Sequence, residues 1–340
     1  MNNFFYFNKE LEYPINTPYM PSELYPEYPY ADSESEDIDQ NAGENMVYTA
    51  IRKLFCGLQL DQENIGNSRW NPLGKYITPG QTVLLKPNLV NHHNPAEMDK
   101  KKGMDCLITH PSIVRCIFDY VYIALKGKGK IIIADAPVQD CEFDKLLNNT
   151  GYGELFQYLH QKSSNTLIIQ TADLREVIYE KNGKMASQTE RNALVFSSQM
   201  IDLGNNSFFY DLKDKNRLRV SNYAGKDTTR HHRTGHNEYK ISNAVIEADV
   251  IISLPKPKGH RIAGYTAALK NMIGINARKE YIPHHRKGRR GDEYVGSHLF
   301  LKLFNSTSND FRNWALRKGC NQLAAFLNDI GRKTGRRLDQ

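Results

Sequence analysis

The stretch ADVIISLPKPKGHRIAGYTAALKNMIG, residues 248–274, decides how the rest of the chain is interpreted. It opens with the apolar run Val250-Ile251-Ile252, which is typical of a buried strand. The run breaks at Leu254-Pro255, where we expect the strand to end. The side chains directly beyond this end are basic and lie two apart: Lys256, Lys258 and His260. Because ligands bind beyond the carboxyl ends of strands in parallel sheets, we expect a site here.

The second half of the same stretch predicts a helix from Ala263 to about Gly274. A lysine in an otherwise apolar helix must reach water or find a partner, so Lys270 is a site candidate. Asn271 has three interpretations that stay open: it contacts the ligand, it orients Lys270, or it caps the end of the helix.

Two further strands are predicted to end in polar side chains. TVLLKPNLV, residues 82–90, carries Lys86 and Asn88 near its end, and KIIIADAP carries Asp135 at its tip. A predicted helix that starts at Pro111 separates the two strands, and this order is the βαβ signature. Lys86 and Asn88 would face the same crevice as the basic residues of 248–274. Asp135 would orient a lysine, bind a metal or cap a helix.

These patterns predict an α/β fold with a mostly parallel sheet flanked by helices. VIYEK-NG-KMASQ is typical of a β-hairpin, so we expect an insertion at about residues 177–220. Residues 1–40 are rich in Tyr, Pro and acids and predict a flexible tail. The α/β domain would occupy 41–300, and 301–340 would be a basic amphipathic helical segment.

Composition favours a cytoplasmic protein with an anionic partner. No apolar segment approaches the roughly 18 residues of a membrane span, and we expect no secretory signal. The five cysteines are scattered, without spacing suited to zinc or an iron–sulfur cluster. The net charge is +7, and Lys256 to Arg290 holds ten Lys or Arg against one acid, Glu280. Such an excess favours an anion.

Five motifs in this order, LLKPNLV, THP, ADAP, ADVIISLPKPKGH and TAALKNMIG, resemble those of a bacterial and archaeal family, the domain of unknown function 362. Some family members carry ferredoxin-like iron–sulfur modules, and others occur near glycan biosynthesis genes. This chain lacks the cysteine clusters that the iron–sulfur modules need. It also lacks a Gly-Glu-Gly-rich loop that family members usually carry, so we expect it to be truncated relative to the full family domain. The family has a more distant similarity to the N-terminal domain of lactate racemases, which hold a nickel pincer nucleotide with lysine and histidine.

The function that follows is an enzyme that binds an anionic small molecule, phosphorylated or carboxylated. The glycan part of this hypothesis rests on the resemblance alone. The substrate-binding candidates are Lys86, Asn88, Lys256, Asn271 and Asp135. The catalytic candidates are His260, Lys270 and Lys258, with His260 as the proton-transfer group.

Two alternatives stay open, a metal or redox enzyme with histidine ligands and a non-enzymatic binding or scaffold protein. None of the histidine pairs has the HExxH spacing of a zinc site. His260, His285 and His110 are preferred as metal ligands over the cluster at 231–236. The cofactor therefore stays unknown. We expect no nucleic acid, because HHRKGRRGDEY lacks interleaved aromatics. The basic C-terminal helix would either touch an acidic membrane surface or pack on the body.

Overall fold

The computed structural model describes residues 46–66, 69–94, 103–182, 185–213, 215–220, 225–260 and 264–286, with isolated positions between 311 and 327. The tail predicted for residues 1–40 lies outside these residues, as does most of the predicted C-terminal helical segment. None of the described helices has the length and apolarity that crossing a bilayer requires.

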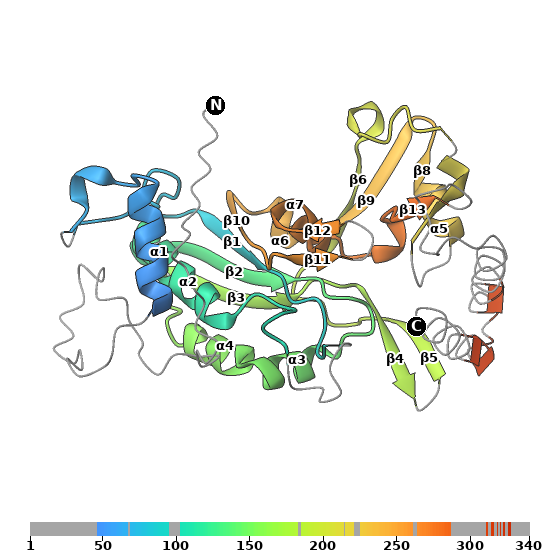
Figure 1. Ribbon diagram of the computed structural model, residues 1–340, viewed down its shortest axis with the longest axis horizontal. Helices are drawn as coiled ribbons and strands as arrows, with labels where there is room; N and C mark the ends of the chain where they lie inside the picture. The colour runs from blue at the N-terminus through green and yellow to red at the C-terminus, as the bar shows by residue number, and fades with distance from the viewer. Residues whose placement is uncertain are drawn as a thin grey trace.

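The centre of the molecule is a parallel sheet of four strands in the order β10-β1-β2-β3 (Figure 1). The strands are β1 (Thr82–Pro87), β2 (Gly129–Asp135), β3 (Leu167–Asp173) and β10 (Val250–Leu254). The central strands β1 and β2 are apolar and buried almost throughout, as parallel strands covered on both faces are. β10 is an edge strand that leaves Ile251 exposed, so the strand predicted at 250–252 is present but is not fully buried. The predicted α/β fold with a mostly parallel sheet is confirmed.

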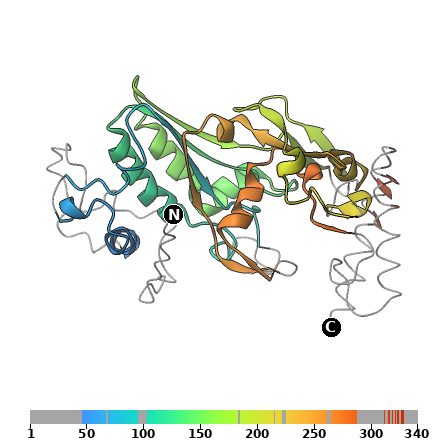
Figure 2. The same cartoon turned by 90° about the horizontal axis from the view of Figure 1, so that it is seen from above.

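Helices cover one face of this sheet (Figures 1 and 2). They are α1 (Met46–Gly57), α2 (Pro111–Leu125), α3 (Phe143–Thr150) and α4 (Tyr152–His160). Val83 and Leu85 of β1 point into the core that these helices share, whereas Leu84 points to the opposite face, as the period of two requires. The core on the opposite face is smaller and includes Ala244 of the short helix α6 (Asn243–Ile246).

Antiparallel strands form the rest of the described chain. The predicted hairpin is confirmed as β4 (Val177–Asn182) paired with β5 (Met185–Glu190). A separate three-stranded sheet has the order β6-β9-β8. Its strands are β6 (Ser198–Asp202), β8 (His232–Arg233) and β9 (His236–Ser242), and it lies apart from the parallel sheet in Figure 1. Further elements beside it are α5 (Gly225–His231), β7 (Leu218–Arg219) and β13 (His285–Arg286), the last two paired with each other. Short 3-10 turns occur at Gln62–Asn64, Gly204–Asn206, Lys215–Arg217 and Lys279–Tyr281.

The helix predicted from Ala263 to Gly274 is wrong over its first part. Lys258–His260 (β11) and Gly264–Thr266 (β12) form an antiparallel hairpin. Gly264 has a φ of 72°, a left-handed backbone that glycine adopts without strain and that interrupts a helix. Helix occurs only in one turn, α7 (Ala268–Asn271), followed by a 3-10 turn (Met272–Ile275). The basic residues therefore sit on a hairpin and a single turn beyond β10.

Candidate functional site

The two lysine-bearing strand ends lie side by side. β1 and β10 are adjacent and parallel, and their register places Lys86 opposite Ser253 and Pro87 opposite Leu254. Thr109 joins the two ends, since its hydroxyl donates to the Leu254 carbonyl oxygen at 2.6 Å and accepts from the Asn88 amide at 3.0 Å. Segments that are far apart in the sequence thus meet at one edge of the sheet.

Lys86 is completely buried at this edge and has a full set of partners. Its ammonium nitrogen lies 2.5 Å from Oδ1 of Asp135. It also donates to the Pro87 carbonyl oxygen at 2.8 Å and to Oδ1 of Asn271 at 3.2 Å. A buried ammonium group needs such compensation, because an unpaired buried charge is strongly unfavourable. Lys86 therefore holds the strand ends together.

Asp135 and Asn271 are fixed as firmly as Lys86. Asp135 accepts hydrogen bonds from the Leu89 amide at 2.7 Å and from the Ala136 amide at 2.9 Å. The side-chain nitrogen of Asn271 donates to the Lys86 carbonyl oxygen at 2.9 Å and to the Ser253 hydroxyl at 3.0 Å. Of the alternatives for Asp135, the orientation of a lysine is the one that the geometry matches. Asn271 likewise orients a lysine, Lys86 and not its neighbour Lys270.

Gly274 and Lys279 complete this arrangement. A Cβ added at Gly274 would lie 1.9 Å from Oδ1 of Asp135 and 2.6 Å from the Lys86 ammonium nitrogen. Only glycine lets the backbone approach the ion pair this closely. The buried Lys279 donates to the Ala136 and Ile273 carbonyl oxygens at 2.7 and 3.2 Å. We call these residues the inner ion-pair cluster: Lys86, Asp135, Asn271, Gly274 and Lys279.

Lys279 is a residue of the inner ion-pair cluster that the sequence did not predict. Burial lowers the pKa of its ammonium group to about 8. The charge of Asp135 opposes this shift, whereas the charges of Lys86 and Arg175 add to it. The partners of Lys279 are mainly backbone carbonyls, which no residue pattern reveals. Its only signal in the sequence was its place within the basic run after Gly274.

The remaining predicted lysines and His260 form a second group, which we call the outer basic cluster: Lys256, Lys258, Lys270 and His260. They are partly exposed. Lys258 donates to Oδ1 of Asn88 at 3.1 Å and to the Leu107 carbonyl oxygen. Partial burial lowers the pKa of Lys258 to about 8, and the charges of Lys256 and Lys270 act in the same direction.

Repulsion between positive charges also acts on His260 in the outer basic cluster. Partial burial lowers the pKa of His260, and the charges of Lys270 and Lys258 lower it further. Partial burial also lowers the pKa of Lys270. Asp135 is the one acid that raises the pKa of Lys258, and Lys86 already occupies its Oδ1 atom. The charges of Lys256 and Lys270 therefore act on Lys258, and the carboxylate that opposes them there belongs to a buried ion pair.

Two further polar residues, Asp173 and His110, have partners of their own. Asp173 forms an ion pair with Arg175 at 2.6 Å, and Arg175 donates to the Val138 carbonyl oxygen at 2.7 Å. His110 caps α2, where its Nδ1 accepts from the Ser112 amide at 3.2 Å. Burial lowers the pKa of His110 to about 4, which keeps the ring neutral at physiological pH.

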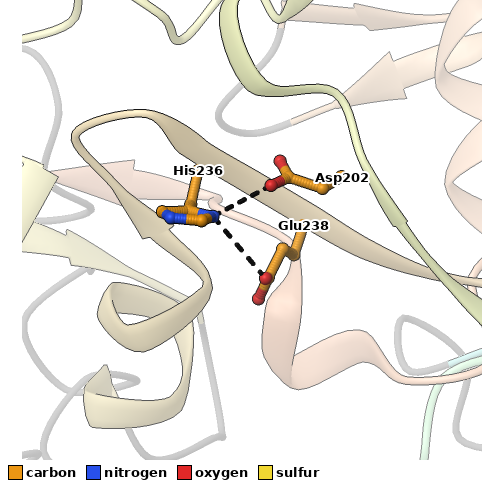
Figure 3. Close-up of side chains that lie close together, drawn as sticks. All are labelled: Asp202, His236 and Glu238. Atoms are coloured by element: carbon orange, nitrogen blue, oxygen red, sulfur yellow. Dashed lines mark hydrogen bonds and ion pairs between the residues drawn. The ribbon is translucent and has the colours of Figure 1, made fainter.

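The preferred metal ligands are not grouped in the described part of the chain. Neither His110 nor His260 lies there with two other potential ligands close enough to share an ion. His285 lies on β13, paired with β7, and its side chain is outside the described residues. A group of three ligand atoms within 4.8 Å of one another does occur elsewhere, at Asp202, His236 and Glu238 (Figure 3). This group includes a histidine from the cluster that sequence reasoning ranked lower.

Comparison with known proteins places the chain in a family without a defined activity. A thylakoid-associated protein, sll1697, from Synechocystis sp. (strain ATCC 27184 / PCC 6803 / Kazusa) is 24% identical over 202 residues. The match covers 59% of this chain and 41% of that protein, so the chain spans less than half the length of this relative. No solved structure matches. The model of the domain of unknown function DUF362 matches residues 83–166 and 164–332, and the chain belongs to that family.

Proposed function

We propose that this protein is an enzyme that binds an anionic small molecule at the carboxyl ends of β1 and β10. The single observation that supports this most is the outer basic cluster itself. The charges of Lys256 and Lys270 lower the affinity of Lys258 for protons, and the charges of Lys270 and Lys258 lower that of His260. An anion bound among them would relieve the repulsion and gain from every charge.

The inner ion-pair cluster supports the site by holding it in place. Asn88, whose side chain accepts from Lys258, follows β1 directly, and Lys270 precedes the buried Asn271. Lys258 is therefore hydrogen-bonded to a residue beside the end of β1, and Lys270 is next in sequence to a buried residue. A preorganised set of positive charges binds an anion without the cost of ordering flexible side chains. In this proposal Lys86 and Asp135 hold the strand ends in place and do not contact the anion.

The proposed chemistry uses His260 as a proton carrier. Its lowered pKa keeps a large neutral fraction at pH 7, which a general base requires. Lys258, with a pKa of about 8, is a second group able to exchange a proton near neutrality. The substrate class, phosphorylated or carboxylated and glycan-related, rests on the family resemblance. The cytoplasm is the proposed location; the Synechocystis relative is described as thylakoid-associated.

The similarity to the lactate racemase N-terminal domain stays a prediction. It would need a lysine and a histidine beside each other at the site, and Lys270 and His260 are close enough for one charge to affect the other. Elemental analysis for nickel in protein purified without added metal would test it, since less than about 0.1 nickel per chain would count against it.

Anion-induced thermal stabilisation tests the binding site. The melting temperature of the full chain would be measured with increasing inorganic phosphate, at constant ionic strength maintained with chloride. We expect phosphate to raise it, and we expect Lys270→Met to remove most of this rise because one of the charges that face the anion is gone. Lys53→Met is the matched control, since Lys53 is an exposed lysine on α1.

An equal response of wild type and Lys270→Met would contradict the proposal. Mass spectrometry of small molecules carried through native purification would then identify the ligand class. With a substrate in hand, His260→Gln should lower kcat while the substrate still binds. If kcat is unchanged, His260 is not the proton carrier, although the anion site itself would stand.

A further inference from the structure

Three potential ligands share one face of the second sheet. His236 and Glu238 are two residues apart on β9, so their side chains project from the same face of the strand. Asp202 on β6 is the cross-strand partner of Glu238. Nδ1 of His236 lies 2.9 Å from Oδ2 of Asp202 and 3.9 Å from Oε1 of Glu238. Figure 3 shows both carboxylates directed at this one nitrogen.

This arrangement places two carboxylates against each other. Like charges directly opposite on neighbouring strands destabilise a sheet, so Asp202 and Glu238 need a cation between them. His236 lies beside both carboxylates and His231 contacts the other oxygen of Glu238, so both rings would have to be protonated to balance the two negative charges. A divalent ion bound to the neutral ring would balance both.

Other groups hold the two carboxylates in place. Oδ1 of Asp202 accepts hydrogen bonds from the Asn237 and Gly204 amides, each at 2.8 Å, which leaves Oδ2 directed at His236. On Glu238, Oε2 lies 2.7 Å from Nδ1 of His231, which leaves Oε1 on the side of His236. Hydrogen bonds to the outer oxygen of a ligating carboxylate are a regular feature of metal sites, where they orient the ligand.

We propose that Asp202, His236 and Glu238 form a binding site for a divalent transition-metal ion, with His231 as a positioning residue. Ligand atoms about 2.0–2.2 Å from a zinc ion lie roughly 3–3.5 Å from one another, and the observed separations of 2.9 and 3.9 Å lie on either side of that range. The side chains are partly exposed, at 45% for His236, 35% for Asp202 and 25% for Glu238. One side of the ion would therefore face water.

The donor set indicates which ions this site would take. One imidazole nitrogen with two carboxylate oxygens suits Zn²⁺ or Mn²⁺ better than Mg²⁺, which prefers oxygen ligands alone. Three protein ligands with an open position are also the arrangement of catalytic zinc sites, whereas structural zinc sites have four. The site belongs to a different sheet from the outer basic cluster and does not depend on the function proposed there.

Titration of the metal-free full chain with ZnCl₂ in a calorimeter, compared with MgCl₂, tests the site. We expect wild type to bind one Zn²⁺ per chain and to bind Mg²⁺ more weakly. His236→Gln and Asp202→Asn should each weaken Zn²⁺ binding more than tenfold. His231→Gln should weaken it about tenfold through the loss of Glu238 orientation, whereas His231→Asn, whose side-chain nitrogen takes roughly the place of Nδ1, should keep more of the affinity.

A competing histidine pair supplies the control. Ring nitrogens of His92 and His93 lie 3.2 Å apart, so this pair could bind Zn²⁺ adventitiously. His92→Gln should leave the Zn²⁺ affinity unchanged. The proposal is overturned if His236→Gln binds Zn²⁺ as tightly as wild type, if His92→Gln abolishes binding, or if wild type binds only in the millimolar range. Melting curves of each metal-free variant would show whether it folds. If His236→Gln does not fold, Zn²⁺ binding by Asp202→Asn tests the site in its place.

Discussion

The inner ion-pair cluster and the outer basic cluster occupy neighbouring positions beyond the same strand ends, yet only the inner cluster pairs a positive charge with a carboxylate of its own. In the inner cluster, buried Lys86 faces Asp135 at 2.5 Å and every polar atom described above has a defined partner. In the outer cluster, partly exposed lysines and His260 repel one another. A lysine near a strand end is therefore not by itself a ligand-binding residue. Burial and the presence of a carboxylate separate a structural lysine from one available to a ligand.

Gly274→Ala should have the largest effect, because it breaks the inner cluster from within. The added methyl group would overlap Oδ1 of Asp135 and the Lys86 ammonium group. We expect a loss of more than about 4 kcal/mol in the free energy of unfolding, or a failure to fold, as a displaced buried ion pair would cause. Urea denaturation followed by circular dichroism would measure it.

Gly153→Ala is the matched control, because Gly153 lies in α4 and an added Cβ would meet nothing closer than 3.6 Å. In a helix, alanine is favoured over glycine by about 1 kcal/mol, so this variant should be at least as stable as wild type. Equal destabilisation by the two substitutions would mean that the close approach at Gly274 is not what holds the cluster.

Lys86→Met should be nearly as damaging. It leaves the Asp135 carboxylate buried without its ammonium partner, which costs about 3–5 kcal/mol. The double variant Lys86→Met/Asp135→Asn removes both charges, so it should be more stable than the sum of the two single effects predicts. Strict additivity in a denaturant-based double-mutant cycle would argue against a direct pair.

Thr109→Val tests the connection between the two strand ends. The substitution keeps the shape of the side chain but removes the hydroxyl that bridges Asn88 and Leu254. We expect a loss of about 1–3 kcal/mol in the free energy of unfolding, because the Asn88 amide loses its acceptor. Phosphate-induced stabilisation should weaken as well if this bridge positions Asn88 for Lys258. An unchanged phosphate response would show that the bridge does not position Asn88 for Lys258.

Lys258→Met should have the smallest effect on the free energy of unfolding, and the size of this effect should depend on pH. The pKa of Lys258 is about 8 in the folded protein and 10.5 as its ordinary value, so between these values the unfolded chain binds more protons. Stability contributed by this residue therefore rises with pH from about 8 towards 10.5 and is least below pH 8. Compared with Lys258→Met, wild type should gain stability as the pH is raised from 7 to 10. Thermal denaturation would measure this difference in stability between wild type and Lys258→Met. A difference that stays constant from pH 7 to 10 would mean that the pKa of Lys258 is not lowered in the folded protein.

The parallel sheet and its order of elements could be predicted because continuous apolar runs identify strands locally, although they did not show that β10 lies at the edge of the sheet. The meeting of Lys86 with the 248–274 stretch followed from one general rule, that parallel strand ends share an edge. The division into two clusters could not be predicted. Whether Lys86 or Lys258 is buried depends on the pairing of Asp135, and a sequence pattern does not show which of several lysines a carboxylate selects.

Two features of the structure, the β11–β12 hairpin and the Asp202–His236–Glu238 group, could not be predicted from the sequence, for different reasons. Residues 263–274 are compatible with a helix over a short window, but the long-range environment turns the first part into the β11–β12 hairpin. The Asp202–His236–Glu238 group depends on pairing between β6 and β9, strands far apart in the sequence whose side chains alternate without an apolar pattern. Cross-strand register is decided by tertiary contacts, and single-sequence spacing does not contain it.

The position of β1 between β2 and β10 has a consequence for the order in which the chain can assemble during synthesis. Asp135 leaves the ribosome long before Asn271, so Lys86 can acquire its carboxylate while the segment carrying β10 has not yet been made. The early βαβ unit would then present an open strand edge with a neutralised lysine beside it, ready for β10 to dock in register. Asn271 and Gly274 would close over a pair that already exists, and the last-made part of the sheet would complete the site.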